Sequence, residues 1–206
     1  MVIPVRKVLW TLLGVSVFLM VMHFFPASVS EVINNRFDMN VEANIPTWFA
    51  SMLLFSIALC AFCIHTLSED RLSRWFWLLF SLGYLYLSVD EDSRIHELVN
   101  SIGVLWVYVL APLALAFFAM CAVYLTRVDQ KSLRNWILGG LAVYALGVLG
   151  CEAIANTVYP SMPALLHEIE YALEEGLELI GSVIVLTGCL GELSRLLNRK
   201  FIARTP

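Results

Sequence analysis

An apolar run that begins at Trp75 leads into the charged stretch Ser88-Val89-Asp90-Glu91-Asp92-Ser93-Arg94-Ile95-His96-Glu97. Four carboxylates, an arginine and an imidazole therefore follow a segment that we expect to cross a membrane. One other stretch is similar, His167-Glu168-Ile169-Glu170-Tyr171-Ala172-Leu173-Glu174-Glu175-Gly176-Leu177-Glu178, but its acids precede the apolar run. We expect the two stretches to meet in the fold.

The composition is that of a membrane protein. The chain is 60% hydrophobic and 15% charged, whereas about 25% of the residues of a typical soluble domain are charged. Its 206 residues have room for about six helical spans of about 20 residues each. We therefore predict an all-α, polytopic transmembrane bundle that forms one integral-membrane domain over residues 1–206. All five cysteines lie in apolar runs, so they indicate no disulfide framework.

Six apolar segments define the expected spans. They cover about 8–25, 47–67, 75–89, 102–126, 136–156 and, as part of a longer helix, 163–198. A secretory signal peptide is the alternative for the first segment, although its apolar run exceeds the usual 7 to 15 residues. The last helix would be roughly 50 Å long at 1.5 Å per residue, so it should extend beyond a hydrocarbon core of about 30 Å.

Basic residues set the expected orientation. Eleven of the 13 Lys and Arg residues fall in the two termini and the alternate loops that share their side, and only Arg36 and Arg94 fall on the other side. The positive-inside rule then places both termini in the cytoplasm. Most acids and three histidines, His23, His96 and His167, belong to the outer side. For Glu31, Glu168 and Glu175, an ordinary solvent-facing role and a functional role both stay open.

Helical spacing distinguishes another set of acids. His167, Glu170, Glu174 and Glu178 fall on one stripe of a helix, where like charges repel. Glu178 and Glu152 are expected at the outer edge of the hydrocarbon, and intramembrane acids indicate function or a charge partner. Asp92 and His96 form an i, i+4 pair if the helix of the third span continues past Val89.

Carboxylates and imidazoles from several helices are the ligands of zinc, iron and manganese sites. The predicted metal ligands are Glu91, His96, Glu152, His167, Glu170, Glu174 and Glu178, and the supporting acids are Asp38, Glu42, Asp90, Asp92 and Glu97. The analogy with ferritin-like di-metal bundles is weak, because this chain has no Glu-x-x-His motif. A structural or proton-handling carboxylate cluster, and an ordinary surface with no site, are the alternatives.

Close helix packing is expected between the last two spans. Small residues allow transmembrane helices to approach closely. The glycines concerned are Gly139, Gly140, Gly147 and Gly150 on one segment and Gly176, Gly181, Gly188 and Gly191 on the other.

Three motifs together resemble a group of small, uncharacterised multi-pass membrane proteins of bacteria. They are Phe37-Asp38-x-x-x-Glu42-x-x-x-Pro46-Thr47-Trp48, Leu87-Ser88-Val89-Asp90-Glu91 followed by His96-Glu97, and Glu174-Glu175-x-x-Glu178-x-x-Gly181. The resemblance implies a helical bundle in the bacterial inner membrane with its motifs facing outward. It brings no activity, but it adds Asp38 and Glu42 to the candidates.

Two functions remain open at this stage. One is a metal-dependent membrane enzyme that acts on a lipid or quinone-like substrate from the outer leaflet. The other is a cation or proton transport protein, which would need polar groups through the full depth of the membrane. A non-catalytic accessory subunit is a third possibility. The sequence has no phosphate-binding loop, nucleophile elbow or basic aromatic surface, so nucleic acid is not an expected partner.

Overall fold

The computed structural model describes residues 3–25, 28–41, 43–95, 106–128, 130–151 and 163–202. All regular secondary structure in these ranges is helical. The elements are α1 (Val5–His23), α2 (Glu31–Phe37), α3 (Ile45–Leu67), α4 (Arg71–Ser93), α6 (Trp106–Arg127), α7 (Lys131–Ala145), the π-helical segment η1 (Leu146–Cys151) and α9 (Ala164–Ile202). The predicted all-α fold is confirmed for this part of the chain.

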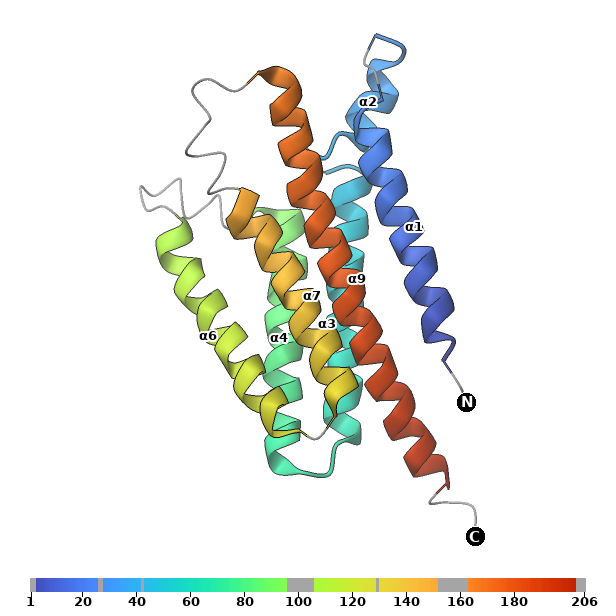
Figure 1. The fold of residues 1–206 in the computed structure, drawn as a ribbon, viewed down its shortest axis with the longest axis vertical. Coiled ribbons are helices and arrows are strands. Elements are labelled where there is room, and N and C mark those ends of the chain that lie inside the picture. Colours follow the sequence, from blue (N-terminus) through green and yellow to red (C-terminus); the bar gives the residue numbers. More distant parts are fainter. Residues whose placement is uncertain are drawn as a thin grey trace.

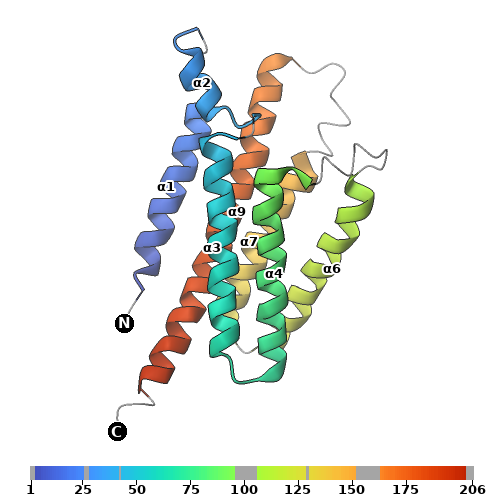
Figure 2. The same cartoon turned by 180° about the vertical axis from the view of Figure 1, so that it is seen from behind.

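The long helices form an elongated bundle around α9 (Figure 1). Helix α9 has 39 residues, which corresponds to about 58 Å of helix. It packs against α7, α3 and α1. Helices α3 and α4 pair on the far side, and α6 lies outside α4 and α7 (Figures 1 and 2). Both ends of the chain point toward the same end of the bundle, which we call the basic end. The opposite end, which carries α2 and the first turns of α9, is the acidic end.

Polar caps fix where several helices begin. The Ser30 side chain accepts a hydrogen bond from the Ile33 amide, and Asn44 accepts one from the Thr47 amide. Asp70 caps α4 by accepting bonds from both the amide and the hydroxyl of Ser73. Each cap satisfies backbone donors that have no partner inside the helix.

Four helices are long and apolar enough to cross a membrane. They are Val5–His23, Ile45–Leu67, Lys131–Cys151 and Leu165–Ile202. The described part of α6 adds a shorter apolar segment, Pro112–Arg127, and α4 is less apolar than the others. Helices overlap all six expected segments, although residues 102–105 and 152–156 of those segments lie outside the described residues. The number of membrane spans stays a prediction. The short helix α2 and the π-helical geometry of η1 were not expected from the sequence.

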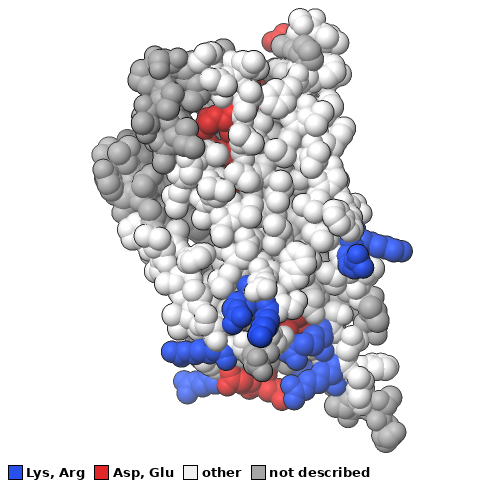
Figure 3. Space-filling view, viewed as in Figure 1, with Lys and Arg blue, Asp and Glu red and all other residues white. Residues whose placement is uncertain are grey.

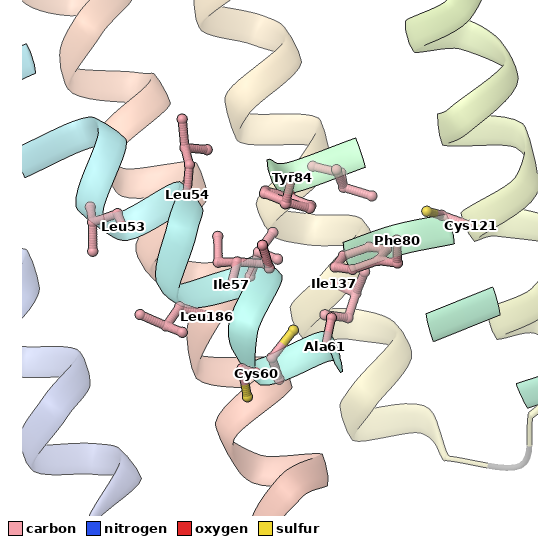
Figure 4. Packing of buried hydrophobic residues seen from close by; sticks show 14 of the residues in the cluster. Leu53, Leu54, Ile57, Cys60, Ala61, Phe80, Tyr84, Cys121, Ile137 and Leu186 are labelled. Carbon is pink, nitrogen blue, oxygen red and sulfur yellow. The ribbon is translucent and has the colours of Figure 1, made fainter. Parts of the chain in front are cut away.

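The core is aliphatic in the middle of the bundle and aromatic toward α6. Ile57 of α3 and Ile137 of α7 are fully buried, and Figure 4 shows them between the other apolar side chains of the cluster. Tyr124 stacks on Phe76 with ring centroids 3.8 Å apart, and Phe80 stacks on Phe117. Cys60, Cys121 and Cys189 are buried free thiols, and they pack as small apolar residues.

Glycines allow α7 and α9 to touch through their backbones. A Cβ atom on Gly181 would lie 2.6 Å from the Tyr144 nitrogen and 2.8 Å from the Gly140 carbonyl oxygen. A Cβ atom on Gly147 of η1 would lie 2.8 Å from the Glu174 carbonyl oxygen. The expected close contact is therefore present at these positions. The prediction is wrong for Gly139 and Gly191, which face open space. Gly176 contacts Met20 of α1 instead of α7.

Charged side chains separate along the bundle. Figure 3 shows Lys and Arg side chains around one end of the molecule and a recessed acidic patch toward the other. A few acids accompany the basic residues at the basic end, among them Asp70 and Glu192. This arrangement places the acidic face and the candidate site at the end of the bundle away from both termini.

Candidate functional site

The acids of α9 face the interior of the bundle at its acidic end. Glu170, Glu174 and Glu178 are spaced four residues apart, so they lie on one face of the helix. Glu170 is 8% exposed, and Glu174 and Glu178 are half-buried. The stripe expected from the sequence therefore points into the protein rather than into solvent.

Glu178 is surrounded by groups from three elements. The Tyr144 hydroxyl of α7 hydrogen-bonds its carboxylate. Glu91 at the end of α4 lies close enough to interact with it electrostatically, as do Glu174 and Glu175. The backbone of η1 covers this face of α9, because a Cβ on Gly147 would lie 3.1 Å from Cγ of Glu178. We call Glu91, Glu170, Glu174 and Glu178 the interior acids.

Glu170 adds an unsatisfied oxygen to the interior acids. Its Oε2 atom is buried and has no hydrogen-bond partner in the described part of the chain. Glu170, Glu174 and Glu178 all lie near the Cys151 thiol at the end of η1. Carboxylates this close repel one another when all are ionised, so a cation or shared protons would stabilise the group.

A second cluster joins α1, the loop after α2 and α9. His23, the last residue of α1, is 3% exposed. Its Nδ1 atom lies 3.3 Å from Oδ1 of Asp38, and its Nε2 atom lies 3.2 Å from Oε2 of Glu168. Asp38 forms the turn after α2, where Oδ1 accepts a hydrogen bond from the Asn40 amide. Aspartate favours such turns, because its side chain can accept a hydrogen bond from the amide two residues on.

Backbone hydrogen bonds determine how the His23 ring is protonated. The Met39 amide donates to Nδ1 at 3.0 Å, so Nδ1 acts as an acceptor. The remaining ring proton of a neutral imidazole is then on Nε2, which donates to the Glu168 carbonyl oxygen at 3.1 Å. The ring in this form clamps three segments together without carrying a charge.

The residues of the His23 cluster can also offer metal ligands. One atom from each of His23, Asp38 and Glu168 lies within 4.8 Å of the others. The two carboxylates, however, flank opposite ring nitrogens, and an ion must share one nitrogen with both of them at about 2.0 to 2.2 Å. Metal binding here would require the ring to give up a backbone hydrogen bond. The cluster as it stands fits a structural clamp better than a preformed metal centre.

The structure brings together some of the residues selected from the sequence. Glu91, Glu170, Glu174 and Glu178 share one region, and His167 is half-buried in the first turn of α9. Asp38 belongs to the His23 cluster instead. Asp90 lies in the last turn of α4 near Tyr86, and Asp92 is exposed. Glu42, His96, Glu97 and Glu152 lie outside the described residues.

The end of α4 bears on the expected pairing of Asp92 with His96. Helix α4 does continue past Val89, but it ends at Ser93, and Arg94 adopts a left-handed conformation with φ of 55°. His96 lies outside the described residues, so its i, i+4 pairing with Asp92 stays a prediction.

The sequence interpretation missed His23 and Glu168 as partners. Glu168 is two residues from Glu170, which turns it by about 200° to the opposite face of α9. That face packs on α1, whose last residue is His23. A histidine at the end of the first span and an acid at the start of the last were the available signals, but only the tertiary packing joins them.

The comparison with protein families identifies the chain. A family model described as a domain of unknown function (DUF8692) matches residues 7–193. The chain therefore belongs to this family. No curated protein and no solved structure matches the sequence.

Proposed function

Because the family carries no known activity, we propose from the site itself that this is a multi-pass membrane protein that binds a divalent metal ion through the interior acids. Zinc, iron and manganese are the candidate metals, and His96, Glu152 and His167 are proposed as additional ligands. We further propose that the metal serves an enzyme that acts on a lipid or quinone-like substrate.

The carrying observation is the buried, unsatisfied Oε2 atom of Glu170 beside Glu174 and Glu178. A buried carboxylate oxygen without a partner is costly, and two further acids, Glu174 and Glu178, lie near the same Cys151 thiol. A divalent cation would satisfy this oxygen and neutralise the repulsion between Glu91 and Glu178. When bound, such an ion would polarise an ester or activate water.

The protein residues have separate roles in this proposal. Glu91 and Glu178 approach from α4 and α9, so together they can hold an ion between two helices. The Tyr144 hydroxyl orients the Glu178 carboxylate through its hydrogen bond. The π-helical segment brings Gly147 against Glu174 and Glu178, which limits access from that side.

The middle of the bundle, between the interior acids and the basic end, favours a metal site at the acidic end over a transport path through the membrane. Between Glu178 and Glu192, a helix length of about 21 Å, α9 has no acidic or basic residue. Its buried positions there include Val183, Val185 and Leu186, which belong to the apolar core. The buried polar residues of α9 in this stretch are Ser182 and Thr187, whose hydroxyl groups carry no charge, whereas a cation or proton pathway would need ionisable groups there. Transport remains the second candidate function because acids do gather at one mouth of the bundle.

Metal binding by the purified protein tests the proposal. Elemental analysis should find a divalent metal, and Mn²⁺ titration followed by electron paramagnetic resonance should show a bound ion. Glu178→Gln and Glu91→Gln should each weaken Mn²⁺ binding by at least about tenfold, because each removes a charged ligand. Glu31→Gln is the matched control, since Glu31 is an exposed acid of the same end.

Glu168→Gln separates the two clusters. It alters the His23 cluster without touching the interior acids, so Mn²⁺ binding should stay at the wild-type level. Loss of binding in Glu168→Gln, with Glu178→Gln unaffected, would assign the metal to the His23 cluster. Absence of bound metal from wild-type protein, before and after Mn²⁺, Zn²⁺ and Fe²⁺ are added, would reject the proposal.

A further inference from the structure

A cleft of about 340 Å³ opens at the basic end of the bundle, far from the interior acids. Its walls are the first turns of α1, the first turns of α7 and the last third of α9. Helices α1 and α7 pack on α9, and Figure 1 shows them on opposite sides of it. Gly188 and Gly191 line it on α9, and Gly191 has no neighbour within 4 Å of a built Cβ.

The cleft is apolar in one part and basic in another. Leu9, Leu133 and Trp136 supply apolar walls, whereas Arg6, Gln130 and Ser132 supply polar groups. Arg6 is exposed and makes no ion pair with the described residues. Lys7 and Trp10 continue this surface along α1, and tryptophan beside basic residues is typical of a membrane interface.

The acid in the cleft does not cancel this positive charge. Glu192 is buried, and both of its oxygens accept hydrogen bonds from Arg195 at 2.7 Å. The pair is neutral as a unit, so Arg6 remains as an uncompensated cation. The first turn of α7 adds to the potential, because Gln130 does not cap it with its side chain and the backbone amides there favour an anion.

We propose that this cleft binds one anionic glycerophospholipid from the leaflet at the basic end. Charge complementarity identifies the occupant: the phosphate group lies against Arg6 and the start of α7, and an acyl chain lies along Leu9, Trp136 and Gly191. Helices α1, α7 and α9 contain segments long and apolar enough to cross a membrane, so lipid chains rather than water would fill an apolar cleft between them. The proposal is independent of metal binding at the acidic end.

Native mass spectrometry of the detergent-purified full chain tests the site. Phosphatidylglycerol should be retained as a single adduct at concentrations where zwitterionic phosphatidylcholine is lost. Arg6→Gln should weaken phosphatidylglycerol binding about fivefold, the effect expected for one basic residue near anionic lipid. Arg71→Gln is the matched control, because Arg71 starts α4 at the same end but does not line the cleft.

Filling the cleft provides a second test. Gly191→Leu should displace the lipid without a clash, since the position is open, and should lower retention of phosphatidylglycerol at least fivefold. Gly139→Leu is its control, because Gly139 is equally open but outside the cleft. Equal retention of the two lipids by wild-type protein, or unchanged retention in both Arg6→Gln and Gly191→Leu, would overturn the proposal.

Discussion

His23 shows how one side chain can hold three segments without a charge. The ring accepts a hydrogen bond from the Met39 amide and donates one to the Glu168 carbonyl oxygen. His23→Phe would keep most of the volume but leave both backbone groups unpaired. Each unsatisfied group costs about 1 to 3 kcal/mol, so the variant should unfold at a clearly lower temperature in detergent.

His65→Phe is the matched control for this change. His65 also bonds a backbone carbonyl, that of Arg74, but its contact is exposed and water can replace it. Thermal unfolding should therefore change little. Equal loss of stability in both variants would show that the buried His23 hydrogen bonds stabilise the fold no more than the exposed one of His65.

Asp70 is expected to make stability depend on pH in the acid range. Hydrogen bonds from the Ser73 amide and hydroxyl lower the pKa of this exposed carboxyl below its usual value, which is about 3.9. A group whose pKa is lower in the folded state stabilises the fold above its unfolded pKa. That contribution is lost as the pH falls through the folded pKa, which lies below about 4.

Asp70→Asn tests this pH effect without removing the cap, since asparagine also caps helices well. The difference in melting temperature between wild type and variant should shrink as the pH is lowered from 6 to 3. A constant difference across this range would contradict the role given to Asp70.

At the scale of elements, the contact between α7 and α9 depends on glycine. A methyl group on Gly181 would meet backbone atoms of Tyr144 and Gly140, which cannot move independently of the helix. Gly181→Ala should therefore destabilise the protein by about 1 to 3 kcal/mol. Gly139→Ala meets nothing within 4 Å, so its thermal unfolding should be unchanged or slightly improved, because alanine favours helix.

The long helices were predictable because their apolar runs are long and uninterrupted. The expected segment from Thr47 to Leu67 lies entirely within α3, and the long last helix appears as α9. Local exceptions were not predictable. Helix α2 has only seven residues, too few for a periodic pattern to stand out, and the π-helical geometry of η1 depends on its packing against α9.

The candidate site was predictable from the sequence only where it depends on the spacing within one helix. Helical spacing correctly grouped Glu170, Glu174 and Glu178 on one face, because that grouping depends on a single helix. The proximity of Glu91 to Glu178 depends on the charged end of α4 and the charged first half of α9 lying at the same end of the bundle. Spans that alternate in direction predict this arrangement as well. The His23 clamp depends on which face of α9 meets α1, and a single sequence does not specify that face.

At the scale of the whole molecule, basic and acidic side chains separate along the long axis of the bundle. Helix α1 begins and helix α9 ends toward the end that carries most Lys and Arg side chains (Figures 1 and 3). The interior acids and the His23 cluster lie at the other end, and the apolar core separates the two. By the positive-inside rule, the basic end should face the cytoplasm.

Cysteine labelling in intact cells tests this orientation. Asn35 is exposed on α2 at the acidic end, and Lys131 is exposed at the start of α7 at the basic end. In a background whose five native cysteines are replaced by serine, Asn35→Cys should react with a membrane-impermeant maleimide added outside. Lys131→Cys should react only after the cells are permeabilised, because labelling then reaches the cytoplasmic face. If Lys131→Cys were labelled in intact cells and Asn35→Cys were protected, the orientation would be reversed. The interior acids would then face the cytoplasm, and their proposed substrate would have to come from the inner leaflet.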